Sequence, residues 1–208
     1  EEALNLIVDA IESAKLKPGK DISICLDVAA NELIDKEGNY SIQSGSHENV
    51  DNVIKYYQNI GSKYPIKSIE DPFSEAARGS WEGLMTFLNA NNKNTQIVGD
   101  DLFTTNPRLI TKGIEQNVAN AILIKPNQIG TLTETINATQ LGQKSNWGTV
   151  VSHRSGETED TSIVDLSIGL GTGQIKTGAP SRGERVAKYN RLLRIEEELG
   201  KNVKMANI

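Results

Sequence analysis

The sequence has one cysteine, no long hydrophobic run and no excess of positive charge. Cys25 has no partner for a disulfide within the chain, which is typical of a reducing compartment. It stands in the apolar run DISICLDVAA, so we expect a buried structural thiol. The chain contains no run of about 18 apolar residues and does not open with a signal peptide. We therefore expect a soluble, cytoplasmic protein with no membrane span.

Basic residues are fewer than acidic ones. The 208 residues include 22 Lys and Arg against 27 Asp and Glu, for a formal net charge of −5. No basic stripe with interleaved aromatic residues is present, although proteins that bind nucleic acids usually carry one. The composition therefore argues against a nucleic-acid partner.

The first residue is not a methionine. The opening EEALNLIVDAIESAKL already has apolar residues at helical spacing, among them Leu4, Ile7, Val8 and Ile11. We therefore expect the chain to be a piece of a longer protein. Its 208 residues are enough for one hydrophobic core, and no linker rich in Pro, Gly or Ser divides them. We expect a single, incomplete domain over residues 1–208.

Six short strand-like runs alternate with helical patterns along the chain. We expect strands at 21–28, 66–71, 95–101, 121–125, 149–154 and 173–178. We expect helices at 47–61, 79–91, 106–116, 130–143, 158–170 and 181–200. Apolar strands that alternate with helices predict a parallel sheet buried on both faces, in an α/β fold.

The strand ends favour a TIM-type (β/α) barrel over an open, doubly wound sheet. In a barrel, functional residues collect at the C-terminal ends of many strands, whereas a doubly wound sheet uses one switch point. Every predicted strand ends in a charged or reactive side chain: Asp27, Glu70, Asp100 with Asp101, Lys125, His153 with Arg154, and Lys176. Six strands do not close an eight-stranded barrel, so we expect two strands to be missing from this chain.

Three carboxylates end the first three strands. Asp27, Glu70 and Asp100 have no histidine or cysteine beside them, and an all-oxygen site of this kind selects Mg²⁺, with Mn²⁺ next. The alternative for each one is a structural role as a cap of a helix or turn. The succession of three carboxylates favours the metal site.

The last three strands supply positive charge. Lys125, Arg154 and Lys176 suit an anionic substrate, and an arginine can bond two oxygens of a phosphate or carboxylate at once. A lysine near other cations is pushed toward its neutral form, as a general base requires. Lys125 is therefore a candidate base. The alternative is a lysine that ends a strand and extends into solvent.

The segment SHRSGETEDT follows the fifth strand. It adds the hydroxyl groups of Ser152 and Ser155 to the candidate anion site. We interpret His153 as a hydrogen-bonding neighbour rather than a metal ligand or base, since His47, the other histidine, lies in a polar loop. The acidic residues of this segment are expected to favour the start of the next helix through its dipole: Glu157, Glu159 and Asp160.

Six segments together resemble enolase, the Mg²⁺-dependent lyase of glycolysis. They are LDVAANE, SIEDPF, QIVGDDLFTTNP, LIKPNQIGTLTET, VSHRSGETEDT and GQIKTGAPSRGERVAKYNRLLRIEEELG, and the resemblance extends over the whole chain. It implies the C-terminal (βα)6 portion of the ββαα(βα)6 barrel. The N-terminal capping domain and the first two barrel strands of the family have no counterpart in these residues.

The resemblance implies a role for each strand-end residue. Asp27, Glu70 and Asp100 match the metal ligands, and Glu70 and Asp100 also border the substrate. Lys125 matches the base that removes the C2 proton of 2-phosphoglycerate, and Lys176 matches the lysine that contacts the substrate carboxylate. The segment that holds the phosphate is matched by Ser152, His153, Arg154 and Ser155, with His153 also a candidate catalytic residue. The implied product is phosphoenolpyruvate, and the full-length protein is expected to be a homodimer.

Three alternatives remain open at this point. The family's acid, a glutamate that helps hydroxide leave, comes from the upstream part, so this chain alone is expected to be impaired or inert. Another member of the enolase superfamily would act on a different carboxylate, although the phosphate-holding segment argues against it. A plasminogen-binding role at the cell surface, which other enolases have through terminal lysines, is minor because this chain ends KNVKMANI.

Overall fold

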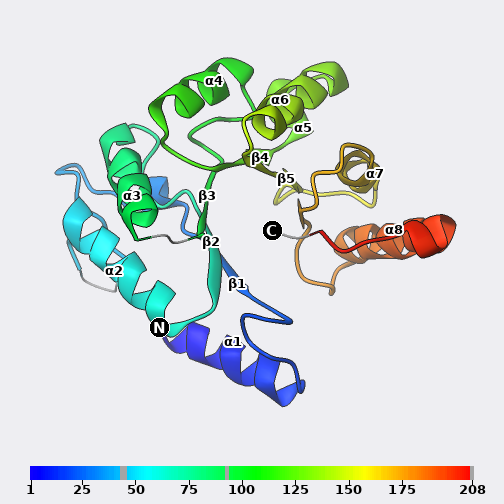
Figure 1. The fold of residues 1–208 in the computed structure, drawn as a ribbon, viewed down its shortest axis with the longest axis horizontal. Helices are drawn as coiled ribbons and strands as arrows, with labels where there is room; N and C mark the ends of the chain where they lie inside the picture. The colour runs from blue at the N-terminus through cyan, green and yellow to red at the C-terminus, as the bar shows by residue number, and fades with distance from the viewer. Residues whose placement is uncertain (43–45, 92–93, 207–208) are drawn as a thin grey trace. The chain divides into compact units, whose positions relative to one another are not determined.

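The computed structural model describes residues 1–42, 46–91 and 94–206. The chain divides into two compact units: Glu1–Leu102 with Gln116–Ala119, and Phe103–Glu115 with Asn120–Ile208. In both units parallel strands alternate with helices (Figure 1). None of the helices within the described ranges is long and apolar enough to cross a membrane.

The first unit contains three parallel strands in the order β1, β2, β3. Its elements are α1 (Glu2–Ser13), β1 (Ile24–Asp27), η1 (Ala30–Glu32), α2 (Val50–Lys63), β2 (Ile66–Glu70), α3 (Arg78–Ala90) and β3 (Gln96–Gly99). In the ladder Asp27 pairs with Glu70, and Glu70 pairs with Val98. The three strands therefore end at nearly the same level of the sheet.

Helices α2 and α3 contribute large apolar side chains to the core of the first unit. Tyr57 of α2 and Trp81 of α3 are almost fully buried. Each also uses its polar atom to bind the chain that follows β2: the Tyr57 hydroxyl donates to the Pro72 carbonyl (2.8 Å), and the Trp81 indole N–H donates to the Ser74 carbonyl (3.1 Å). The two aromatic residues thus position the loop that begins at the end of β2.

The second unit contains the parallel strands β4, β5 and β6. Its elements are α4 (Pro107–Gln116, whose last residue belongs to the first unit), β4 (Ala121–Ile124), α5 (Pro126–Ile129), α6 (Leu132–Lys144), β5 (Gly148–Ser152), α7 (Ser162–Gly169), β6 (Ile175–Lys176), α8 (Gly183–Leu199) and η2 (Gly200–Asn202). All four residues of β4 are completely buried. In this strand the predicted burial on both faces is confirmed.

Helix α6 lies close against β4 and β5. A Cβ added at Gly142 would stand 2.7 Å from the Cδ1 atom of Ile122 and 3.1 Å from the Cγ2 atom of Thr149. The helix begins with Thr131 as its N-cap, because the Thr131 hydroxyl accepts the Glu134 N–H (3.2 Å) and donates to the Glu134 carboxylate (2.6 Å). Thr131 therefore determines where α6 begins, and Gly142 allows its close packing against β4 and β5.

Two expectations about the strands were wrong. Cys25 is exposed and β1 is not buried on both faces, because β1 lies at the edge of its sheet. β6 has only two residues instead of six, and neither is fully buried. The expected helix at 158–170 begins only at Ser162, and the separate short helix α5 precedes α6. The other predicted elements are present with boundaries shifted by a few residues.

Candidate functional site

The strand register predicts that the three proposed metal ligands share one face of the first unit's sheet. Asp27 and Glu70 are paired in the ladder, and side chains of paired residues point to the same face. Asp100 follows Val98, the partner of Glu70, by two residues, so alternation predicts the same face for it. Only 6% of Glu70 and 9% of Asp100 are exposed. The three carboxylates thus come from the carboxyl ends of adjacent strands, as predicted.

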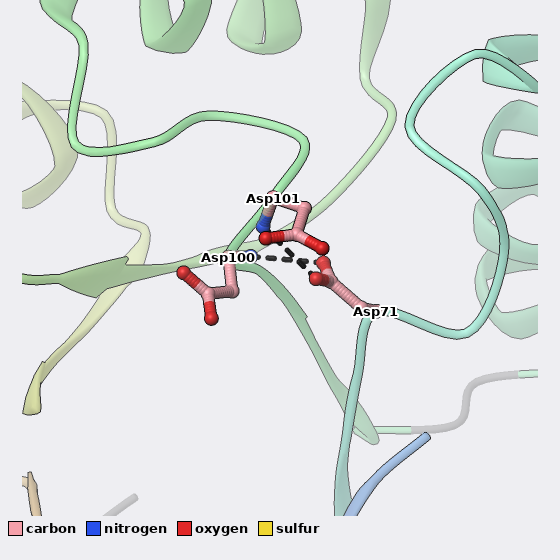
Figure 2. A group of neighbouring side chains, drawn as sticks. All are labelled: Asp71, Asp100 and Asp101. Carbon is pink, nitrogen blue, oxygen red and sulfur yellow. Dashed lines mark hydrogen bonds between the residues drawn. The ribbon is translucent and has the colours of Figure 1, made fainter. Parts of the chain in front are cut away.

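Asp71, which the sequence analysis did not single out, holds the turn that carries Asp100. Its two carboxylate oxygens accept the backbone N–H groups of Asp100 and Asp101, each at 2.9 Å. Figure 2 shows the Asp71 carboxylate pointing at these amides, while the Asp100 side chain extends away from it. The Asp71 N–H in turn donates to the Val98 carbonyl (3.0 Å). The available signal was the doubling of acidic residues in IEDP and GDD.

The acidic residues around Asp71 repel one another. Burial, with a smaller contribution from the charges of Asp100 and Asp101, raises the pKa of Asp71 to about 7 despite the two amide hydrogen bonds that lower it. One oxygen from each of these three residues lies within 4.8 Å of the others. Because the Asp71 oxygens accept the amides of Asp100 and Asp101, Asp71 positions the backbone that carries Asp100. A divalent cation nearby would relieve the repulsion, which fits an all-oxygen metal site.

The loops that follow β1, β2 and β3 are bonded to one another. The Asn31 amide donates to Asp101 (2.9 Å), and its side-chain oxygen accepts the Glu75 N–H (3.2 Å). Asn31 follows Ala29, which has a left-handed backbone with a φ of 47°. These bonds fix the loops around the carboxylate face.

Lys125 ends the buried strand β4 and starts the short helix α5. Its backbone N–H donates to the hydroxyl of Thr105 (2.9 Å), and that hydroxyl donates to the side-chain oxygen of Gln128 (2.8 Å). Thr105 is completely buried. Pro126 occupies the first turn of α5, where its missing N–H costs nothing. The turn after the apolar run therefore fixes the backbone of the lysine, and Lys125 itself is half-buried.

Lys125, Ser152 and Lys176 stand level with one another in the second unit. Ser152 pairs with Lys176 in the ladder, and Lys125 follows Ile124, the partner of Val151, by one residue. The three side chains are therefore expected on the same face of the strands β4, β5 and β6. The register therefore places the candidate catalytic residues Lys125 and Lys176 at the same level as Ser152, the first residue of the predicted phosphate-binding segment.

The phosphate segment continues from β5 into an exposed loop. The Ser152 hydroxyl donates to the His153 carbonyl (2.9 Å), so its lone pairs remain available as acceptors. Arg154 and Ser155 are exposed, and the Arg154 guanidinium donates to the side-chain oxygen of Asn127 on α5 (3.1 Å). Arg154 thus lies beside the turn that carries Lys125.

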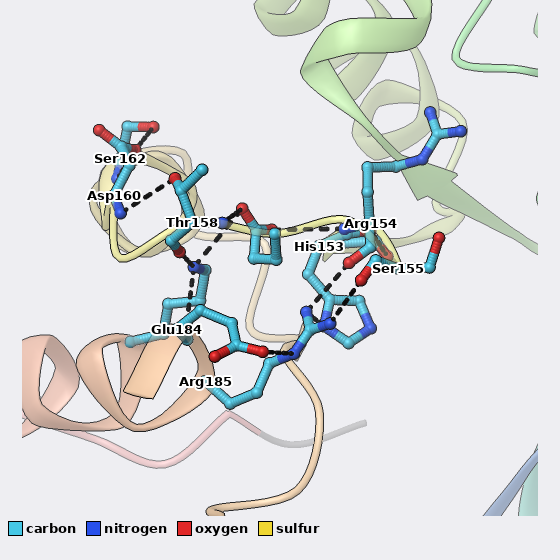
Figure 3. A network of polar contacts seen from close by, with 11 residues as sticks. His153, Arg154, Ser155, Thr158, Asp160, Ser162, Glu184 and Arg185 are labelled. Carbon is cyan, nitrogen blue, oxygen red and sulfur yellow. Dashed lines mark hydrogen bonds and ion pairs between the residues drawn. The ribbon is translucent and has the colours of Figure 1, made fainter. Parts of the chain in front are cut away.

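His153 is a hydrogen-bonding residue, as predicted. Its Nδ1 atom lies 2.6 Å from Nη1 of Arg185, a residue of α8 that the sequence analysis did not single out (Figure 3). Burial lowers the pKa of His153, and the positive charges of Arg185 and Lys176 lower it further. The ring is therefore held toward its neutral form.

The acidic residues after Arg154 have different structural roles. Asp160 lies just before α7 and accepts the N–H of Ser162, the first residue of that helix (2.8 Å). Glu157 instead lies 3.7 Å from the Lys188 ammonium and accepts the Arg154 N–H (3.3 Å). The other histidine, His47, is paired with Asp35 (3.0 Å) on an exposed loop.

Comparisons with known proteins identify the family. A family profile described as "Enolase, C-terminal TIM barrel domain" matches residues 1–208. The chain is 54% identical over 208 residues to a protein named enolase from Pelagibacter ubique, covering all of this chain and 49% of that protein. It is 50% identical over 204 residues to enolase from Tropheryma whipplei, covering 98% of this chain and 47% of that protein. The chain therefore spans about half the length of these relatives, and it belongs to the enolase family as a C-terminal TIM barrel domain.

Proposed function

We propose that the protein carrying this chain is an enolase that reversibly dehydrates 2-phosphoglycerate to phosphoenolpyruvate. The observation that carries the proposal is the alignment of the candidate residues in the strand register, at the carboxyl ends of the strands of each unit. Lys125, Ser152 and Lys176 stand at one level of the second unit, and three carboxylates end the strands of the first unit. The names of the relatives support the same activity.

The residues of the first unit fit a hard divalent cation, which we propose to be Mg²⁺. Asp27, Glu70 and Asp100 would hold it, because they offer only oxygen ligands from one face of the sheet. The cluster of carboxylate oxygens from Asp71, Asp100 and Asp101 within 4.8 Å of one another supports a cation near Asp100. When bound, Mg²⁺ supplies positive charge that offsets the charge developing on the substrate carboxylate.

The residues of the second unit bind the anionic groups of the substrate in this proposal. Arg154 and Ser155, with Ser152 and His153, hold the phosphate through charge-assisted hydrogen bonds. Lys176 binds the carboxylate and so favours the negative charge that builds up there.

Lys125 removes the C2 proton. The hydrogen bond from its backbone N–H to the Thr105 hydroxyl fixes where its side chain begins. The electron pair of the C2–H bond moves toward the carboxylate and then forms the C2–C3 double bond as hydroxide leaves C3. We propose that the acid for this second step comes from sequence upstream of residue 1.

The test is an assay of phosphoenolpyruvate formation from 2-phosphoglycerate with Mg²⁺. It compares residues 1–208 alone, the same chain mixed with the upstream half of an enolase, and the natural protein with its flanking sequence. We expect turnover by the natural protein, restored at least in part by the mixture, and little or none by residues 1–208 alone. Absence of turnover by the natural protein would refute the proposal. Near-normal turnover by residues 1–208 alone would refute the upstream acid.

We further propose that the natural protein acts in the cytoplasm as a homodimer. Both proposals rest on the family and on the reducing compartment that the single cysteine indicates. Size-exclusion chromatography with light scattering tests the dimer, and a monomer at micromolar concentration would contradict it.

A further inference from the structure

Helix α8 buries two cations that the proposed chemistry does not use. Only 9% of Arg185 is exposed, and Lys188 is completely buried. Burying a cation is costly unless its hydrogen bonds are satisfied, so the partners of these two side chains indicate what they are for. Nearly all of those partners belong to the segment that follows β5 (Figure 3).

Arg185 binds the first half of that segment at three points. Its Nη1 atom lies 2.6 Å from His153 Nδ1 and donates to the Arg154 carbonyl (3.0 Å), while Nη2 donates to the Ser155 carbonyl (3.1 Å). The three acceptors, one imidazole and two backbone carbonyls, belong to residues proposed to bind the substrate phosphate. One rigid guanidinium thus spans three consecutive residues, which a lysine at this position would be unable to do.

The contact with His153 also determines the state of the imidazole. A guanidinium only donates hydrogen bonds, so Nδ1 of His153 accepts and carries no proton. The neutral ring then has its proton on Nε2. Gly178, with a φ of 86°, allows this contact, because a Cβ there would lie 2.9 Å from Arg185 Cδ and 3.2 Å from His153 Cε1.

Lys188 binds the second half of the segment from one helical turn further along. Its ammonium donates to the Thr158 carbonyl (2.8 Å) and to the Glu184 carbonyl (2.9 Å), and lies 3.7 Å from Glu157. Glu157 in turn accepts the N–H of Arg154 (3.3 Å). Lys188 therefore also supports the backbone of Arg154, through Glu157.

We propose that Arg185 and Lys188 are positioning residues that hold the segment 152–158 in the conformation that receives the substrate phosphate. Arg185 sets the backbone of Arg154 and Ser155 and the Nε2–H tautomer of His153, and Lys188 holds Glu157 and Thr158 behind them. Neither side chain touches the substrate. The inference rests on the proposed function, since it assigns a purpose to the segment that binds the phosphate.

The test compares Arg185→Met and Arg185→Lys with a matched control, Arg191→Met. Arg191 lies on the same helix, but binds Asp165 and Glu198 outside the segment. In the natural protein we expect Arg185→Met to lower kcat/KM for 2-phosphoglycerate by roughly 10- to 100-fold, mainly through KM, because phosphate contacts exist in the ground state too. The control should stay within about twofold, as expected of a surface ion pair.

A second measurement does not depend on activity. In ¹⁵N NMR spectra of the imidazole, Nδ1 of His153 should appear as an unprotonated acceptor in the wild type and in Arg191→Met. In Arg185→Met the ring should become a mixture of tautomers, and the amides of 153–158 should exchange faster with solvent. Lys188→Met should speed exchange in the second half of the segment only.

The two measurements separate the possible failures. A wild type that neither binds nor converts 2-phosphoglycerate would refute the proposed function, and the NMR and exchange data would still decide the inference. Unchanged KM together with an unchanged His153 tautomer in Arg185→Met would overturn it. If Arg185→Met does not fold, the same measurements are made on Arg185→Lys. Its single ammonium is expected to restore stability without restoring the three contacts to His153, Arg154 and Ser155.

Discussion

The Thr105 hydroxyl group holds the backbone of Lys125, and its removal should be measurable as a loss of stability. Thr105→Val keeps the shape of the side chain but deletes the acceptor of the Lys125 N–H and the donor to Gln128. Thr105 is completely buried, so the valine leaves the Lys125 N–H and the Gln128 oxygen facing a methyl group. An orphaned buried donor costs about 1–3 kcal/mol, and we expect the free energy of unfolding to fall by that amount. Since the lost bond also fixes the turn of Lys125, kcat should fall as well.

The assay is urea unfolding of the natural protein, followed by tryptophan fluorescence. Thr139→Val on α6 is a matched control, because this buried hydroxyl donates only to the Thr135 carbonyl within its own helix (2.8 Å). The control should cost at most about 1 kcal/mol and leave kcat unchanged. If Thr105→Val costs no more than the control, the hydroxyl does not hold the Lys125 turn.

Three further predictions follow from the second unit. Gly142→Val should lower the free energy of unfolding by about 1–3 kcal/mol in urea titrations, because the new side chain would overlap Ile122 and Thr149, and an unchanged midpoint would contradict the close packing of α6. Folding lowers the pKa of His153, so the unfolded state takes up a proton first as the pH falls below about 6.5, and the free energy of unfolding should decrease there. Thermal unfolding across pH 5–8 measures this decrease, and His153→Asn should flatten it. Arg154→Ala should weaken binding of 2-phosphoglycerate by at least about tenfold in calorimetry, as expected for loss of a charge-assisted bond, and unchanged affinity would favour a different carboxylate substrate.

The order of strands and helices was predictable because each element has its own local signal. β4 is an unbroken apolar run, and α6 begins with the N-cap Thr131 in the segment TLTE. The position of each candidate residue at the end of a strand followed from the same reading. Edge effects were not predictable, because the sequence of β1 is as apolar as that of a central strand. Cys25 is exposed for that reason.

Residues that support the site were harder to find than residues proposed to act in it. Asp71 follows Glu70 directly and looks like a second ligand, yet its oxygens bind the amides that follow β3. Arg185 and Lys188 look like the solvated face of a charged helix, and only their burial against the segment after β5 distinguishes them. Such roles depend on contacts 29 to 32 residues away along the chain, which local patterns do not report.

Proton abstraction by Lys125 is the central claim, and hydrogen exchange at C2 of 2-phosphoglycerate tests it most directly. The natural protein is incubated with the substrate in D₂O with Mg²⁺, and deuterium at C2 is measured by ¹H NMR as the C2 signal is lost. The account predicts exchange by the wild type and none above background by Lys125→Ala, with substrate binding retained in the variant. Exchange at an undiminished rate by Lys125→Ala would contradict it, because another group would then be the base.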